Sequence, residues 1–137
     1  MIDNILIRRS LLEIPTILKL LSDENRLRIL NILKESFLCV GEIQTILNIK
    51  QSNASSHLEK LKTYGLITNK KKAQWIYYQI CFDKIEEYPF IKQLLYTDIK
   101  TSPIFKEDLD KLKKYKDSGL DCQDLRKVGF DFSKIKF

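Results

Sequence analysis

Histidine and glycine are scarce in this chain of 137 residues, which contains one histidine and four glycines. A single histidine, His57, cannot form a metal site alone. The four glycines are too scattered to make a glycine-rich loop that cradles phosphate. No serine or cysteine stands at a catalytic spacing from a base. The composition therefore gives an enzyme little support.

Long apolar runs and a rich set of cysteines are also missing. No run approaches the roughly 20 apolar residues that would span a bilayer, and the start, MIDNILIRRS, lacks the pattern of a signal peptide. The cysteines, Cys39, Cys81 and Cys122, are odd in number and widely separated, which argues against a secreted disulfide framework. We expect a cytoplasmic protein, with no membrane association, whose cysteines are reduced thiols.

The residues that are abundant favour a small globular domain with a polyanionic partner. Hydrophobic residues make up 44% of the chain, which is enough for a modest core, and the formal net charge is +6. Between positions 50 and 80 six lysines face a single acidic residue, Glu59. A local excess of this kind suggests binding to nucleic acid. The alternative is a lysine-rich surface that only keeps the protein soluble.

The spacing of apolar residues predicts a run of helices through the first half of the chain. A first segment, about residues 2–21, is interrupted by Pro15, and Ser22 or Asp23 then caps a second helix that reaches about Lys34. A third helix ends near Asn48, and a fourth begins at Gln51. Because so few residues separate the last two helices, we expect a helix-turn-helix over about residues 40–64.

A basic β-hairpin is predicted directly after this pair, over residues 66–80. Gly65 ends the fourth helix, residues 66–69 form one strand, residues 70–74 form a basic tip, and residues 75–80 form the second strand. We interpret its aromatic residues, Trp75, Tyr77 and Tyr78, as a packing face rather than a platform for stacked bases. The predicted fold class is mainly α with a small β-hairpin wing, a winged helix-turn-helix.

The remainder of the chain predicts two more helices and a tail. Residues 84–99 and 102–115 carry apolar stripes flanked by charge, which would pack on the core or on a second subunit. Residues 119–137 have no clear period, and we expect an irregular C-terminal tail. The chain is thus predicted to form a single domain over residues 1–118.

The fourth helix carries the strongest functional signal. Ala54, Leu58 and Leu61 share one face, whereas the other face presents amides and hydroxyls, which read base edges when a helix lies in the major groove. Lysines of the wing would neutralise phosphate or enter a minor groove. The predicted DNA-binding residues are Gln51, Ser52, Asn53, Ser55, Ser56, His57, Lys60, Lys70, Lys71, Lys72 and Gln74.

The stretch from Leu20 to Ile80 resembles the ArsR/SmtB family of dimeric winged-helix repressors. LSDENRLRIL is similar to the second-helix motif of that family, QSNASSHLEKLKTYGLI to its recognition helix, and KKKAQWIYYQI to its wing. The resemblance implies a homodimer joined through the first and last helices, about residues 2–21 and 84–116. It also implies a palindromic DNA operator, with half-sites one helical turn apart, and release of the operator when an effector binds.

The chain departs from the family pattern at two positions that bear on turn geometry and effector. Ala73 stands where the wing of the family carries glycine, and alanine is less easily accommodated in a left-handed turn. In the arsenic and cadmium sensors of the family, the third helix begins with two cysteines. Here LCVGEI retains Cys39 but has Gly41 in place of the second. The zinc and nickel site of the family, on a C-terminal helix, is excluded because no histidine follows His57.

The sequence therefore does not determine which effector the protein senses. A thiophilic ion such as arsenite or antimonite would use about three thiolates, and Cys39, Cys81 and Cys122 are the candidates. The alternatives are redox or sulfur sensing by a pair of cysteines, and sensing that involves no cysteine. A winged-helix module that binds protein instead of DNA is a further alternative, which the basic wing and polar helix face disfavour.

Overall fold

The computed structural model describes residues 14–134 and has the predicted mainly helical, winged helix-turn-helix architecture. Residues 14–21 are helical. In chain order there follow α2 (Glu24–Leu33), β1 (Leu38–Cys39), α3 (Val40–Leu47), α4 (Gln51–Thr63), β2 (Ile67–Lys72), β3 (Trp75–Ile80), α5 (Phe82–Glu87), α6 (Pro89–Tyr96), a 3₁₀ turn (Asp98–Thr101), α7 (Pro103–Asp117), α8 (Cys122–Lys127) and a second 3₁₀ turn (Phe132–Lys134).

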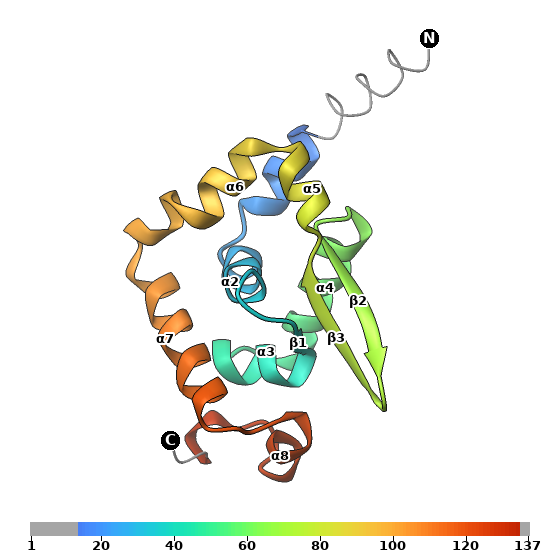
Figure 1. Ribbon diagram of the computed structural model, residues 1–137, viewed down its shortest axis with the longest axis vertical. Coiled ribbons are helices and arrows are strands. Elements are labelled where there is room, and N and C mark those ends of the chain that lie inside the picture. Colours follow the sequence, from blue (N-terminus) through green and yellow to red (C-terminus); the bar gives the residue numbers. More distant parts are fainter. Residues whose placement is uncertain (1–13, 135–137) are drawn as a thin grey trace.

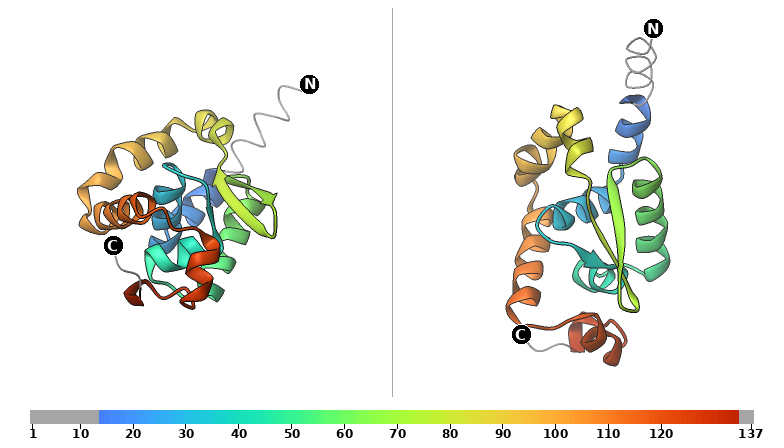
Figure 2. Two further views of the ribbon diagram at one scale, coloured as in Figure 1. Left: turned by 60° about the horizontal axis from the view of Figure 1, so that its bottom comes forward. Right: turned by 45° about the vertical axis from the view of Figure 1, so that its right-hand side comes forward.

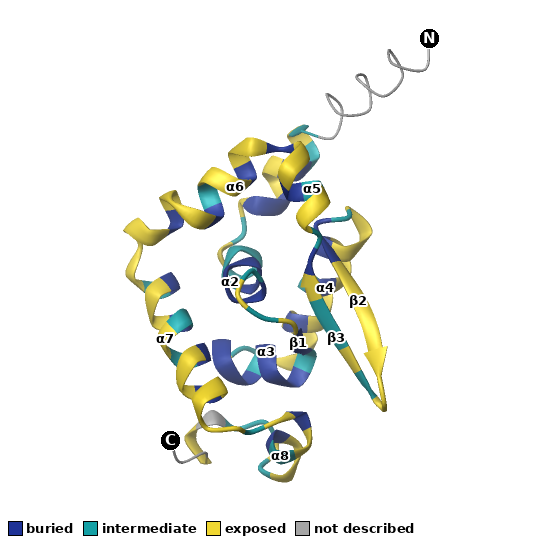
Figure 3. Ribbon diagram, in the orientation of Figure 1, coloured by how far each residue is buried: buried dark blue, intermediate teal, exposed yellow. Residues whose placement is uncertain are grey.

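Helix α2 lies at the centre of the molecule, and the other elements surround it (Figure 1). Asp23 caps it as predicted, since its carboxylate accepts a hydrogen bond of 3.0 Å from the Arg26 amide. Ile29, Leu30 and Ile32 are fully buried, so nearly the whole circumference of its second half meets other elements. Colouring by burial separates this interior, with α3, from the exposed wing (Figure 3).

The helix-turn-helix pair forms where the sequence predicts it. Asn48 ends α3 in the left-handed conformation, with φ of 54°, and α4 begins three residues later. The start of α3 is closed by Glu42, whose carboxylate accepts a hydrogen bond of 2.9 Å from the Cys39 amide. Gly65, with φ of 79°, turns the chain from the end of α4 into the wing. Figure 2 shows the wing alongside α4.

The wing differs from its prediction at the tip. Strands β2 and β3 pair in antiparallel register from Ile67↔Ile80 to Lys72↔Trp75, so the three lysines belong to the strand and the turn consists of Ala73 and Gln74 alone. Lysine is disfavoured in strands, but this preference depends on context, and pairing with the regular strand β3 overrides it here. Ala73 itself adopts the left-handed φ of 55°.

A two-residue strand, β1, completes the sheet in the order β1-β3-β2. Leu38 pairs with Tyr78 and Cys39 with Tyr77. Two residues are too few to carry a detectable alternation, so the sequence did not predict this strand. Its consequence is that Cys39 lies at the junction of the sheet and α3.

Two predictions for the C-terminal half are wrong in detail. The helix expected over residues 84–99 is divided into α5 and α6, because Pro89 occupies the first turn of α6 and cannot continue α5. The tail expected to be irregular contains α8, which Asp121 caps and Leu125, fully buried, anchors. Six residues are too short for the apolar period to be visible. The segment predicted as helix over residues 2–13 lies outside the described residues.

The structure has no membrane-spanning candidate among residues 14–134, since none of their helices is both long and apolar enough to cross a bilayer.

Candidate nucleic-acid interface and cysteine site

Helix α4 separates its apolar and polar residues onto opposite faces. Ala54, Leu58 and Leu61 are completely buried against the core. The polar residues predicted to contact DNA are exposed along the remainder of the helix, namely Gln51, Ser52, Asn53, Ser55, Ser56 and Lys60. Lys50 precedes the helix and makes no side-chain cap, so the first backbone N–H groups of α4 are not bound by a capping side chain. The result is an exposed, hydrogen-bonding helix end on a rigid base.

His57 is different from its neighbours on α4, because it is partly buried against α2. Its Nδ1 lies 3.3 Å from a guanidinium nitrogen of Arg26, and its Nε2 lies 3.8 Å from the Asp23 carboxylate. Burial holds the pKa of His57 below its usual value, and Arg26 acts in the same direction while Asp23 opposes it. The predicted DNA-binding set therefore includes one residue, His57, that connects α4 to the cap of α2.

The sheet presents its lysines on two faces. One face of the sheet is turned to the core and α4, as the burial of Leu38, Ile67 and Ile80 shows. Because side chains alternate along a strand, Lys71 lies on the same face as Ile67. Lys70 and Lys72 extend on the opposite side, where Lys70 pairs with Tyr77 across the strands. All three lysines are exposed, as is Gln74 in the turn. Thus only Lys71 shares the α4 side of the wing.

Cys39 and Cys122 are joined in a disulfide bond that links the start of α3 to the start of α8. Both are buried. The expectation of reduced cysteines is therefore wrong for this pair, because the folding of α8 onto α3 brings together residues that are 83 positions apart. Neither the number nor the spacing of the cysteines in the sequence predicts that these two residues meet.

Cys81 remains a free thiol and does not join the pair. Cys81 directly follows β3, and it lies four residues after Tyr77, the residue of β3 that pairs with Cys39. Four residues of extended chain span about 13 Å, so Cys81 lies well away from Cys39. Within one chain, a site made of all three cysteines is not formed.

Two residues that the sequence did not single out complete the surroundings of the disulfide. Glu42, only 4% exposed, accepts hydrogen bonds from the Cys39 amide and from the Tyr115 hydroxyl. Burial and the Glu42 carboxylate raise the pKa of Tyr115 far above its usual value, so this hydroxyl stays protonated as the donor. The spacing of Glu42 three residues after Cys39 is a capping-box signal that could have identified it. Tyr115, 73 residues away, gave no signal.

The ligand atoms of Cys39, Glu42 and Cys122 lie within 4.8 Å of one another. Two sulfurs and a carboxylate are donors for a thiophilic ion once the disulfide is reduced. However, both Glu42 oxygens already accept hydrogen bonds, and trivalent arsenic would require one more thiolate. The donor set thus fits a dithiol that forms and breaks a disulfide better than it fits a three-thiolate ion site.

The comparison with known proteins identifies the family. A family model described as "Bacterial regulatory protein, arsR family" matches residues 23–69, which contain α2, α3, α4 and the start of the wing. The structure of reduced HlyU from Vibrio cholerae is 31% identical, with a TM-score of 0.56, and the similarity covers 64% of this chain and 90% of that one. This chain belongs to the arsR family.

Two further relatives agree with this assignment, and the second of them is described as a possible ArsR-family transcriptional regulator. Arsenic resistance transcriptional regulator ArsR1 of Pseudomonas putida is 37% identical over 73 residues, which cover 53% of this chain and 57% of that regulator. The chain thus spans somewhat more than half the length of this relative. The homodimeric winged helix-turn-helix DNA-binding domain Mb0332 from Mycobacterium bovis is 25% identical, with a TM-score of 0.56, over 65% of this chain and 82% of that one.

Proposed function

We propose that this chain is a transcriptional regulator that binds double-stranded DNA through α4 and the wing. The observation that carries the proposal is the exposed row of amides and hydroxyls on α4, held on a fully buried apolar face. Gln51, Asn53 and Ser55 would meet base edges, and the first amides of α4 and Lys71 would meet phosphates. The relatives named above, which are regulators and a DNA-binding domain, support the same interpretation.

The regulator would act as a homodimer on a palindromic operator. Support comes from the homodimeric relative and from apolar side chains left exposed at one end of the molecule. These are Leu18 before α2, Phe82 in α5, and Phe90 and Tyr96 in α6. The predicted dimer helices, residues 2–21 and 84–116, include three of the four, and Phe82 lies two residues before the second range. Exposed aromatic residues on adjacent helices are typical of a surface that a second subunit covers.

The Cys39–Cys122 pair would supply the effector response. In the reduced form the two thiols would be free, and a peroxide would take two electrons and two protons from them, giving the disulfide and water. Because the bond ties α3 to α8, the two forms differ in how firmly the C-terminal segment is held against the helix-turn-helix. We infer that the dithiol form represses and that disulfide formation releases the operator. A relative has been described in a reduced form.

A second candidate effector is a thiophilic ion bound by the reduced pair. The proximity of Cys39, Glu42 and Cys122 favours it. Arsenite or antimonite would then compete with peroxide for the same thiols. Protection of both cysteines from alkylation by arsenite, but not by buffer alone, would support the ion.

Band shifts with the DNA upstream of the gene test the proposed function. The reduced protein should prefer a site in that DNA over random sequence, and its affinity should fall steeply with salt. Equal affinity for random DNA would contradict the regulator, and binding by a monomer would contradict the dimer. Sedimentation of the free protein and of its DNA complex measures the second point.

A further inference from the structure

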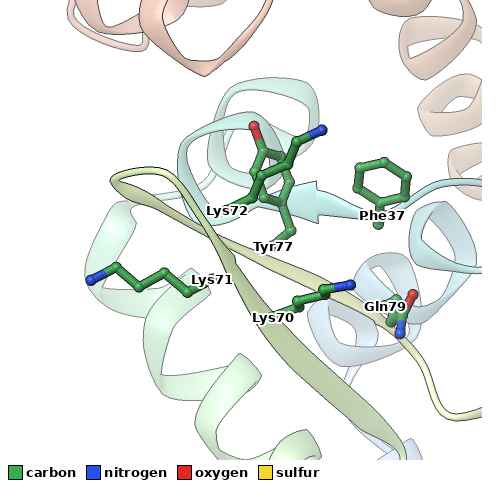
Figure 4. A pocket seen from close by; sticks show the side chains of 6 residues that line it. All are labelled: Phe37, Lys70, Lys71, Lys72, Tyr77 and Gln79. Atoms are coloured by element: carbon green, nitrogen blue, oxygen red, sulfur yellow. The ribbon is translucent and has the colours of Figure 1, made fainter.

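An open pocket of about 400 Å³ lies on the side of the sheet that faces away from α4. Its lining consists of Phe37, Lys70, Lys71, Lys72, Tyr77 and Gln79. Figure 4 shows Lys70 and Lys72 on the side of β2 where Phe37 and Tyr77 lie, whereas the Lys71 side chain extends to the other side. The pocket is therefore separate from the proposed base-reading surface.

The charged side chains that line this pocket are lysines. Within residues 14–134, neither Lys70 nor Lys72 has an ion-pair partner, and Lys116 of α7 reaches over the Phe37 ring, with Nζ 5.8 Å from its centre. The carboxylates that act on Tyr77 are engaged elsewhere. Glu42 is buried and hydrogen-bonded, and Asp121 accepts a hydrogen bond from the Asp124 amide as the cap of α8. An anion would thus meet Lys70 and Lys72, which form no ion pair within residues 14–134.

The same pocket offers an aromatic surface. The Phe37 side chain is 53% exposed, and its ring meets that of Tyr77 edge to face, with centroids 5.6 Å apart. An exposed phenylalanine beside free ammonium groups has no role in the core. A flat ring placed on these aromatics would cover apolar area, and Gln79 adds an amide for hydrogen bonding.

We propose that this pocket is a binding site for a small organic anion that carries a carboxylate on a flat aromatic ring. The carboxylate would lie between Lys70 and Lys72, and the ring would lie against Phe37 and Tyr77. The Tyr77 hydroxyl is 3.7 Å from the Cys122 sulfur, so the occupant would rest beside the cysteine pair without using it. This site goes beyond the proposed function, and its test uses no DNA.

Calorimetric titration of the full chain with 2-naphthoate, in the absence of DNA, tests the site. The control ligand is 2-naphthamide, which keeps the ring but removes the charge. The test variant is Lys70→Gln/Lys72→Gln. The matched control is Lys19→Gln/Lys62→Gln, which removes the same two charges from exposed positions that do not line the pocket. We expect the double variant to raise the Kd for naphthoate about fivefold, as two exposed charge contacts would, and the control to leave it nearly unchanged.

Naphthamide should also bind about fivefold more weakly than naphthoate, for the same reason. Phe37→Ser, which keeps both lysines, should weaken both ligands alike. The absence of saturable naphthoate binding would overturn the proposal. So would equal affinity for naphthamide, or an equal loss in Lys19→Gln/Lys62→Gln, since binding would then be hydrophobic or follow net charge alone. Equal urea midpoints for the variants establish that they are folded.

Discussion

The ring of Phe130 lies against Gly41, in the space that a β-carbon at that position would need. The contact holds the segment after α8 onto the first turn of α3. The Thr45 hydroxyl, which donates to the Gly41 carbonyl at 2.6 Å, also lies 3.2 Å from the Phe130 carbonyl oxygen. In the arsenic and cadmium sensors that this chain resembles, a cysteine stands where Gly41 stands here. Here the Phe130 ring fills the space that a side chain at this position would need.

Gly41→Ala should destabilise the protein by about 1 to 3 kcal/mol, because the new methyl group overlaps the Phe130 ring. The sign of the change in unfolding free energy tests the contact, because the same substitution in a helix without such a neighbour would stabilise the helix by about 1 kcal/mol. Urea unfolding measures the effect. In a Phe130→Ala background the penalty should disappear, and a Gly41→Ala protein as stable as the wild type would contradict the contact.

Asp108 of α7 forms the buried end of an ion pair with Arg28 of α2. Its carboxylate accepts two hydrogen bonds from the guanidinium, at 2.8 and 2.9 Å, and Arg28 also donates to the Leu47 carbonyl at the end of α3. Asp108→Ala should cost about 3 to 5 kcal/mol, because it leaves the guanidinium partly buried without a counter-charge. Thermal unfolding measures the loss. Glu107→Ala, a neighbouring acid that is exposed, is the control and should change little.

His57 should make stability depend on pH. Its pKa in the folded protein is lowered, so as pH falls below about 6.5 the unfolded chain binds a proton before the folded one does. The free energy of unfolding should therefore decrease from pH 7 to pH 5, and His57→Gln should reduce that slope. Urea titrations across this range measure it. Identical slopes in the two proteins would contradict the burial of the imidazole against α2.

Gln51→Ala should relax the choice of base at one operator position, at a cost of about 1 to 3 kcal/mol for the preferred sequence. Lys71→Ala should instead weaken all sequences alike and reduce the slope of affinity against salt. Binding to a library of operator variants separates the two effects. If Lys71→Ala altered sequence preference, the proposed division between α4 and the wing would be wrong.

The sequence predicted those elements whose pattern is local. Asp23, Asn48 and Gly65 mark helix ends by their own chemistry, and the buried face of α4 follows from the spacing of Ala54, Leu58 and Leu61. The exposed row on α4 was predictable for the same reason.

The cysteine site was not predictable, because it depends on contacts between distant residues. Cys39 meets Cys122, and Glu42 meets Tyr115, only after α7 and α8 return to α3. Strand β1 and helix α8 are also too short to show a period. The two faces of the wing became clear only when the register showed that Lys70 and Lys72 lie inside a strand.

The affinity of the protein for its operator in the dithiol and disulfide forms tests the central claim most directly. Fluorescence anisotropy with labelled operator DNA would compare protein held in excess reductant with protein oxidised by peroxide, alongside Cys122→Ser and Cys81→Ser. We expect oxidation to weaken operator binding at least about tenfold, or 1.4 kcal/mol, in the wild type and in Cys81→Ser. Cys122→Ser should bind the operator in both conditions. Equal affinity of the two wild-type forms, or a response retained by Cys122→Ser, would contradict the account.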